Sequence, residues 1–233
     1  MDHESLVVDV PVEHAGRTAT LAVFDLDRTL LAGSSLVPFA RHLTRSGALP
    51  RRTLVDALLR DLRYRHRGST DGSVSRVRQT VTKLATGRAY EPLRLVAEEV
   101  GARLVGEMSP SARMLVHRHL LAADFCVVLS ASPQELVDAV VYGLGAHRGV
   151  GTRVEVVDGH LTGELVGPFC YGGGKLERLR MELGDVELEA AWAYADSMSD
   201  LPLLERAAHA VAVRPDRSLR RIARERSWPI LDF

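Results

Sequence analysis

The sequence contains little cysteine, no net charge and no long apolar run. Its two cysteines, Cys126 and Cys170, are too few and too far apart in a 233-residue chain to form a disulfide framework. We therefore expect two free thiols and a reducing, cytoplasmic location. The apolar runs fall well short of the ~18 residues that a membrane-spanning helix needs, so we expect no transmembrane segment. The first 18 residues are acidic and lack the basic and apolar regions of a signal peptide, which predicts a flexible extension over residues 1–18.

The charges are balanced overall but unevenly distributed. Thirty basic and thirty acidic residues cancel, so the whole chain has no general attraction for nucleic acid, and we expect no such partner. Between residues 36 and 90, however, eleven arginines and one lysine face three aspartates, a net charge of +9, and the rest of the chain carries −9. This asymmetry predicts that the basic segment belongs to a separate structural unit.

Short apolar segments alternate with segments of helical periodicity. Four of them read as buried strands: residues 18–24, 123–129, 190–195 and 208–213. Leucines recur with helical spacing at positions 54, 58 and 62 and again at 176, 179 and 183. The pattern predicts an α/β fold, a Rossmann-like parallel sheet covered on both faces. A hairpin is expected over residues 154–165, about the turn at Asp158 and Gly159.

The first two expected strands are too far apart in the sequence for a single crossover helix. Residues 36–112 therefore form an insertion, which we expect to be helical and to act as a cap domain. The core would then consist of residues 19–35 and 113–233.

Polar residues follow the expected strands at the point where each one ends. Asp25 and Asp27 come directly after the first strand, Ser130 after the second and Asp196 after the third. Open parallel sheets bind ligands at this edge. Asp25 and Asp27 share one side of an extended chain, and two charges ~4 Å apart repel by roughly 4 kcal/mol at an effective dielectric of 20, so a cation or proton must compensate. The alternative is a surface turn with two solvated acids.

Three further segments carry candidate side chains. Ser132 is a candidate helix N-cap, with Pro133 at the first helical position and Glu135 completing a capping box, which would place Ser130 beside a phosphate-binding helix N-terminus. Lys175 follows three glycines and opens a helix. Asp196 and Asp200 lie four residues apart, with Ser199 between them as a candidate cap. Each feature also has an ordinary structural explanation, such as a solvated lysine or acids that favour a helix dipole.

In this order, D-x-D-x-T, serine, lysine and D-x-x-x-D resemble the motifs of the haloacid dehalogenase superfamily of phosphohydrolases. The long insertion after the first motif resembles the cap of the phosphoserine-phosphatase-like branch, subfamily IB. The resemblance implies Mg²⁺-dependent hydrolysis of a small phosphorylated metabolite through an aspartyl-phosphate. It implies that Asp25 is the nucleophile and that Asp27 is the general acid and base.

The same resemblance assigns the remaining groups. Mg²⁺ would be held by the carboxylates of Asp25 and Asp196 and the carbonyl oxygen of Asp27, with Asp200 supporting the metal or the lysine. The transferring phosphoryl group would be neutralised by hydroxyl, ammonium and backbone N–H groups, namely those of Thr29, Ser130, Ala131 and Lys175.

Three positions depart from the family pattern. Relatives that act on phosphoserine carry an acid soon after the first motif, whereas here Ser34 and Ser35 occupy that stretch and no acid occurs before Asp56. Arg28 fills the position before Thr29, and Ser199 stands where many relatives have asparagine. We therefore expect a substrate other than phosphoserine, with phosphoserine phosphatase as the alternative.

The basic insertion suggests a substrate with a second anionic group. Candidate contacts to the substrate are Ser34, Arg76 and Arg78, although the arginines are equally compatible with a solvated helix. From other classes of protein, a phospho-receiver domain and a phosphate-binding regulatory protein without turnover remain alternatives.

Overall fold

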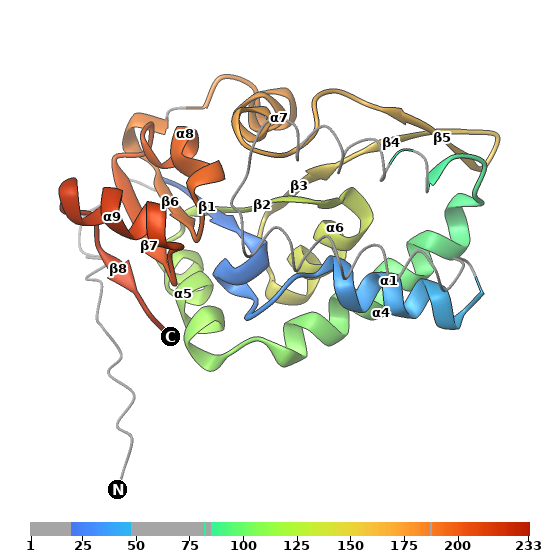
Figure 1. Cartoon of the computed structure of the whole chain (residues 1–233), viewed down its shortest axis with the longest axis horizontal. Coiled ribbons are helices and arrows are strands. Elements are labelled where there is room, and N and C mark those ends of the chain that lie inside the picture. The colour runs from blue at the N-terminus through green and yellow to red at the C-terminus, as the bar shows by residue number, and fades with distance from the viewer. Residues whose placement is uncertain (1–19, 48–81, 83–84, 187) are drawn as a thin grey trace, which may run out of the picture.

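The computed structural model describes residues 20–47, 82, 85–186 and 188–233, and the structural statements below refer to these residues (Figure 1). Six strands form one sheet in the order β3-β2-β1-β6-β7-β8, and each pair of neighbours runs parallel. The strands are β1 (Leu21–Asp25), β2 (Phe125–Pro133), β3 (Arg148–Thr152), β6 (Trp192–Ala195), β7 (His209–Val213) and β8 (Ile230–Leu231). The predicted parallel α/β core is confirmed, and β3 and β8 are added to the four expected strands.

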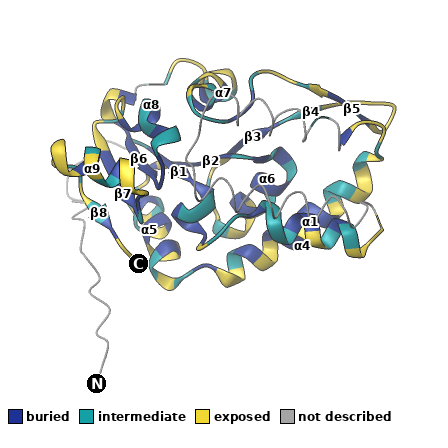
Figure 2. Cartoon of the chain, in the orientation of Figure 1, coloured by how far each residue is buried: buried dark blue, intermediate teal, exposed yellow. Residues whose placement is uncertain are grey.

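Alternate residues of the central strands supply two hydrophobic clusters, one on each face of the sheet. Phe24 and Val128 belong to one cluster, and Val23 and Val127 belong to the other. All four side chains are fully buried, as Figure 2 shows for the strands in general. Burial of a valine- or phenylalanine-sized side chain contributes roughly 1.5–3 kcal/mol, which explains why near-continuous apolar segments form the strands at the centre of the sheet.

Helices cover both faces. The cluster of Phe24 is completed by α1 (Leu36–Arg45), α4 (Tyr90–Glu107), α5 (Pro110–Leu121) and α6 (Gln134–Leu144). The cluster of Val23 is completed by α7 (Gly173–Leu183), α8 (Leu201–Leu204) and α9 (Arg217–Glu225). Short 3₁₀ turns occupy Leu188–Ala190 and Met198–Asp200. None of the described helices combines the length and hydropathy needed to cross a membrane.

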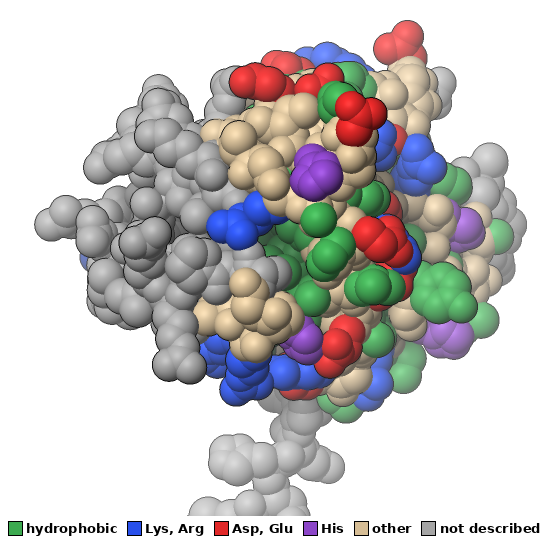
Figure 3. All heavy atoms as spheres, turned by 90° about the vertical axis from the view of Figure 1, so that its right-hand side faces the viewer, with side chains coloured by type: hydrophobic (Ala, Val, Ile, Leu, Met, Phe, Trp, Pro, Cys, Tyr) green, Lys and Arg blue, Asp and Glu red, His purple; other side chains and the backbone are tan. Residues whose placement is uncertain are grey.

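The expected hairpin forms from β4 (Val154–Val157) and β5 (His160–Leu165), which pair antiparallel. Asp158 and Gly159 both adopt positive φ, 48° and 74°, as a tight two-residue hairpin turn requires. At the end of the molecule where α4 and the hairpin lie, apolar side chains reach the surface among charged ones (Figure 3). Leu95 of α4 and Val157 of β4 are half exposed there.

Two predicted helix caps are wrong. Ser132 lies within β2, and α6 begins at Gln134 without a side-chain cap, because the Ser132 hydroxyl lies 2.6 Å from the hydroxyl of Ser35 instead. Ser199 lies inside the turn Met198–Asp200, where its hydroxyl is 2.5 Å from that of Ser197, and α8 begins after Asp200. In both cases another hydroxyl group competes successfully with the helix N–H groups.

Helices α4 and α6 approach closely at a glycine, which makes their packing testable. A Cβ atom on Gly101 would lie 2.4 Å from Cβ and 3.1 Å from the backbone carbon of Ala139 in α6, so Gly101→Ala must push the two helices apart. We expect a loss of about 1–3 kcal/mol in the free energy of unfolding, measured by urea denaturation.

Gly106, in the same helix α4, has open space around it and serves as the matched control. Gly106→Ala should leave stability unchanged or raise it by up to about 1 kcal/mol. Equal stabilities of the two variants would contradict the packing of α4 on α6.

Candidate active site

The chain turns sharply after β1, and this turn fixes the orientation of Asp25. The tight turn Leu26–Leu30 follows Asp25 directly, and within it Arg28 adopts the left-handed conformation with φ 64°. The Thr29 hydroxyl donates to Asp25 Oδ2 at 2.9 Å. Arg214, at the end of β7, donates from Nη2 to the carbonyl oxygens of Thr29 (2.7 Å) and Leu31 (2.8 Å). The turn is therefore held from within and from the neighbouring strand end.

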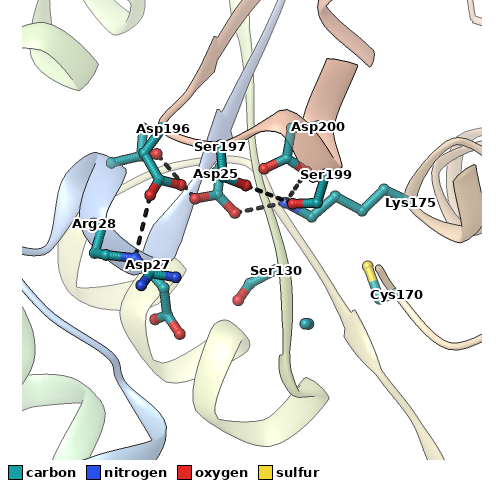
Figure 4. A network of polar contacts seen from close by, with 12 residues as sticks. Asp25, Asp27, Arg28, Ser130, Cys170, Lys175, Asp196, Ser197, Ser199 and Asp200 are labelled. Atoms are coloured by element: carbon teal, nitrogen blue, oxygen red, sulfur yellow. Dashed lines mark hydrogen bonds and ion pairs between the residues drawn. The ribbon is translucent and has the colours of Figure 1, made fainter. Parts of the chain in front are cut away.

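Lys175 lies between two buried carboxylates (Figure 4). Its Nζ is 2.6 Å from Asp25 Oδ1 and 2.6 Å from Asp200 Oδ1, and all three residues are at least 95% buried. Burial alone would lower the pKa of Lys175, but the charges of Asp200 and Asp25 and their hydrogen bonds raise it well above its ordinary value. The lysine is therefore a permanent cation at the base of the site.

The loop before α7 brings Lys175 to this position. Gly172 adopts φ 56°, and a Cβ atom on Gly174 would lie 2.2 Å from the carbonyl oxygen of Phe169. Gly172 and Gly174 thus permit a turn that a larger residue at either position would disfavour or block, whereas Gly173 has open space around it.

Asp196, at the end of β6, adds a third carboxylate. One oxygen from each of Asp25, Asp196 and Asp200 can be chosen so that all three lie within 4.8 Å of one another. Burial raises the pKa of Asp196 first and the charge of Asp25 raises it further, while Arg28, whose Nε lies 3.2 Å from Asp196 Oδ2, lowers it in part. Burial likewise raises the pKa of Asp200 against the attraction of Lys175. The cluster therefore holds more negative charge than its surroundings stabilise.

This cluster fits a magnesium ion. Mg²⁺ prefers oxygen ligands at ~2.1 Å, so two of its ligands lie at most about 4.2 Å apart. The three carboxylate oxygens lie within 4.8 Å of one another, so small side-chain movements suffice to bring them to one ion. If all three carboxylates are ionised, Lys175 and Arg28 balance two of their negative charges and one remains. The donor atoms are all carboxylate oxygens, which suit magnesium better than a thiolate- or imidazole-preferring metal.

Asp27 lies apart from the cluster and is held by the start of α1. The backbone N–H of Ser35 donates to its Oδ1 at 2.9 Å, and the Ser34 hydroxyl donates to its Oδ2 at 3.4 Å. Burial raises the pKa of Asp27 to about 6, with the hydrogen bonds of Ser35 offsetting part of the shift. A carboxyl with this pKa exchanges a proton readily near neutral pH.

Ser130 belongs to β2, and Figure 4 shows it on the same side of the sheet edge as Asp25, Asp27 and Lys175. Its Oγ accepts a hydrogen bond from the backbone N–H of Ser132 at 3.2 Å, and the hydroxyl of Ser132 is paired with that of Ser35. A short hydrogen-bonded chain thus connects Asp27 with Ser130 through two buried serines. The carbonyl oxygen of Ala131 accepts from the Thr152 hydroxyl at 2.9 Å, which connects the last part of β2 to the end of β3.

The structure brings most of the sequence-predicted residues together. Those in mutual contact are Asp25, Thr29, Lys175, Asp196 and Asp200, and Ser34 contacts Asp27. Arg76 and Arg78 lie outside the described residues. Sequence reasoning missed Arg214 and Ser35. Arg214 directly follows β7 as Asp196 directly follows β6, so its place after an apolar strand could have identified it. The expected strand before Ser130 was too short, since β2 continues to Pro133. Ser35 holds Asp27 through its backbone N–H, which no residue type predicts.

A parallel α/β sheet that gathers a buried lysine, three carboxylates and a proton-exchanging acid at the carboxyl ends of its strands defines an enzyme. The family model for haloacid dehalogenase-like hydrolases matches residues 22–205, and the chain belongs to that family. The resemblance inferred from the motifs is thereby confirmed.

Named relatives agree with this assignment. A probable phosphatase of Mycobacterium tuberculosis is 37% identical over 94% of this chain and 77% of its own. A phosphoserine phosphatase of the same species is 32% identical over 99% of this chain and 79% of its own. A histidinol-phosphatase of Neisseria meningitidis is 30% identical over 91% of this chain and 98% of its own.

Solved structures share the fold. A protein of unknown function from Bordetella pertussis is 27% identical, with a TM-score of 0.78 over 93% of this chain and 99% of that one. A substrate-bound phosphoserine phosphatase has a TM-score of 0.62 over 93% of this chain and 94% of its own, at 18% identity, and supports the fold alone.

The raised pKa of Asp27 makes the stability of the metal-free protein depend on pH. Because the pKa rises from 3.8 in the unfolded chain to about 6 in the folded protein, the folded state binds the extra proton, and stability is lost as pH rises through this range. Asp27→Asn should therefore melt close to wild type at pH 4 and several degrees higher at pH 7, by calorimetry in EDTA.

Asp185→Asn removes an exposed carboxylate and should show no such growing difference. If the melting difference between Asp27→Asn and wild type did not change with pH, the burial of Asp27 would not govern its protonation.

Proposed function

We propose that this protein is a Mg²⁺-dependent phosphatase that hydrolyses a small phosphomonoester through an aspartyl-phosphate on Asp25. The observation that carries the proposal is the setting of Asp25. Its carboxylate accepts hydrogen bonds from Lys175 and Thr29, and it shares a metal-sized cluster with Asp196 and Asp200. A carboxylate fixed in this way is a positioned nucleophile.

The first step transfers the phosphoryl group to the protein. An oxygen of Asp25 attacks phosphorus while the bond to the alcohol oxygen breaks, and Asp27 donates its proton to that oxygen. Lys175, the Ser130 hydroxyl and the N–H of Ala131 are the groups that we assign to the phosphoryl oxygens. When bound, Mg²⁺ would be held by Asp25 and Asp196 with the support of Asp200, and would neutralise charge on the phosphoryl group.

The second step returns the protein to its initial state. Asp27, now ionised, accepts a proton from a water molecule that attacks the phosphorus of the aspartyl-phosphate, and the Asp25 carboxylate leaves. A pKa of about 6 suits both directions of proton transfer near neutral pH. The hydrogen bonds of Asp27 to Ser34 and Ser35 hold it apart from the nucleophile throughout.

We propose a substrate other than phosphoserine. Ser34 and Ser35 stand where phosphoserine-specific relatives carry an acid, so this stretch has no carboxylate to hold a substrate amine. Both serines donate a hydrogen bond to Asp27 instead. Among the named relatives, one is a phosphoserine phosphatase and another a histidinol-phosphatase, so sequence similarity alone does not identify the substrate. The basic insertion favours a second anionic group on the substrate, and the buried free thiols are consistent with a cytoplasmic location.

Asp27 also bears on the alternatives without turnover. A phospho-receiver domain and a phosphate-binding regulator need the acidic cluster and the lysine, but they have no use for a separately held acid with a pKa near 6. This group shortens the life of an acyl-phosphate, and it therefore favours an enzyme.

The metal requirement and the nucleophile are tested together with p-nitrophenyl phosphate. Wild type should hydrolyse this substrate with Mg²⁺. The rate should fall at least 10³-fold in EDTA, which removes the ion that neutralises the phosphoryl group, and in Asp25→Asn, which removes the nucleophile. Radiolabelled substrate should label wild type at Asp25 after a rapid acid quench and leave Asp25→Asn unlabelled.

Asp185→Asn is the matched control for loss of one carboxylate and should retain full activity. Absence of Mg²⁺-dependent turnover in wild type contradicts the proposed function, and labelling at another residue contradicts the assignment of Asp25.

The substrate class is tested with a panel of phosphorylated metabolites, compared by kcat/KM. We expect substrates with a second anionic group to exceed phosphoserine. For the best of them, Arg76→Ala or Arg78→Ala should lower kcat/KM at least tenfold, since loss of a charge-assisted hydrogen bond costs about 1.5–3 kcal/mol. The same variants should leave the rate with p-nitrophenyl phosphate within twofold. Phosphoserine as the best substrate, or arginine variants equal to wild type on every substrate, would refute this part of the proposal.

A further inference from the structure

Arg28 places a positive charge on the carboxylate that the metal needs. Its Nε lies 3.2 Å from Oδ2 of Asp196. The Arg28 side chain is 28% exposed and that of Asp196 only 9%, so a partly exposed guanidinium contacts a more buried carboxylate. Figure 4 shows this contact.

The backbone keeps Arg28 in this position. The residue adopts φ 64°, a conformation that favours glycine, and its N–H donates to the carbonyl oxygen of Gly33 at 3.2 Å. Arg214 holds the carbonyl oxygens of Thr29 and Leu31 on the far side of the same turn. Because the turn is fixed at both ends, the guanidinium remains within reach of Asp196.

The charges of the cluster are divided between two cations. Lys175 lies between Asp25 and Asp200, and Arg28 lies beside Asp196. When all three carboxylates are ionised, as metal binding requires, the two cations in direct contact with them leave one uncompensated negative charge, and without Arg28 two would remain; Arg214 also interacts with Asp196, but it stays the same in both cases. A divalent ion therefore balances the cluster that lacks Arg28, and it is attracted less strongly by the cluster that contains this additional positive charge.

We propose that Arg28 is an internal counter-ion that competes with the divalent metal for Asp196 and so raises the Mg²⁺ concentration that this protein requires. The inference rests on the proposed function, because it takes the three-carboxylate cluster as the metal site. In the metal-free protein burial raises the pKa of Asp196, and the guanidinium offsets part of this shift by favouring the ionised carboxylate. A metal ion that binds Asp196 must either displace the guanidinium from Oδ2 or lie close to its positive charge. Both lower the affinity for the metal.

A different role for Arg28 gives the opposite result. If the guanidinium served mainly to orient Asp196 for the metal, its removal would weaken Mg²⁺ binding. The direction of the change in affinity therefore separates competition from orientation, and it is measured on binding alone, without substrate.

The test is isothermal titration of Mg²⁺ into the full chain at one pH, with wild type, Arg28→Gln and Arg28→Lys. We expect Arg28→Gln to lower the dissociation constant at least tenfold, because removal of a unit charge about 5 Å from a divalent ion changes affinity by more than a factor of ten even at the dielectric of water. Arg28→Lys keeps the charge and should stay closer to wild type. Arg41→Gln, an exposed arginine on α1, is the matched control and should bind as wild type does.

Arg28→Gly provides a second variant, because glycine accepts the left-handed conformation without strain and protects the test against misfolding of Arg28→Gln. For each variant, the rise in melting temperature with Mg²⁺ gives an independent measure of affinity. Both uncharged variants should reach half of this rise at a lower Mg²⁺ concentration than wild type.

The outcomes distinguish this inference from the proposed function. Mg²⁺ affinities of Arg28→Gln and Arg28→Gly that equal wild type or fall below it overturn the competition, even if the protein is an active phosphatase. Absence of Mg²⁺ binding in every variant overturns the metal site itself and the inference with it. Tighter binding in both uncharged variants, with Arg41→Gln unchanged, supports the competition.

Discussion

Lys175 allows three carboxylates to lie close together in the interior. Without it, Asp25 and Asp200 would face each other across a few ångströms of buried space, and one of them would take up a proton. The lysine is 150 residues away from Asp25 in the sequence, so the ion pair forms only once α7 is docked on the sheet. Neither carboxylate is in its working state before the whole domain has folded, which makes this interaction the one on which the rest of the site depends.

The sheet determines where the other groups lie. Asp25, Asp196 and Arg214 stand at or just past the ends of β1, β6 and β7, and Ser130 lies in the last part of the adjacent strand β2. Parallel registers such as Ala22 beside Cys126 and beside Trp192 fix how far each strand end projects. A slip of one residue in any of these pairings would turn a functional side chain to the opposite face. The relative positions of the site residues therefore depend on backbone hydrogen bonds between strands, at a distance from the reacting groups.

The sequence was informative where a residue's role follows from its place at a strand end, and less so where its role depends on competition between hydrogen bonds. Asp25 and Asp196 could be assigned to a common site because both end apolar strands. Ser132 resembled a helix cap, yet its hydroxyl is paired with that of Ser35, a partner 97 residues away. The strand β3 was missed because its sequence, RGVGT, contains two glycines and one large apolar residue, and its pairing with β2 compensates for this weak propensity.

The contact between Ser35 and Asp27 has a mechanical consequence. Ser35 immediately precedes α1, which packs in the hydrophobic cluster on one face of the sheet, and its N–H holds one oxygen of Asp27. The position of α1 and the geometry of the acid are thus set by the same peptide unit. A tilt of this helix away from the sheet would carry the N–H off the carboxylate, and a return would restore it. Any displacement of this helix would therefore also change the hydrogen bonding of the acid, because one peptide unit serves both.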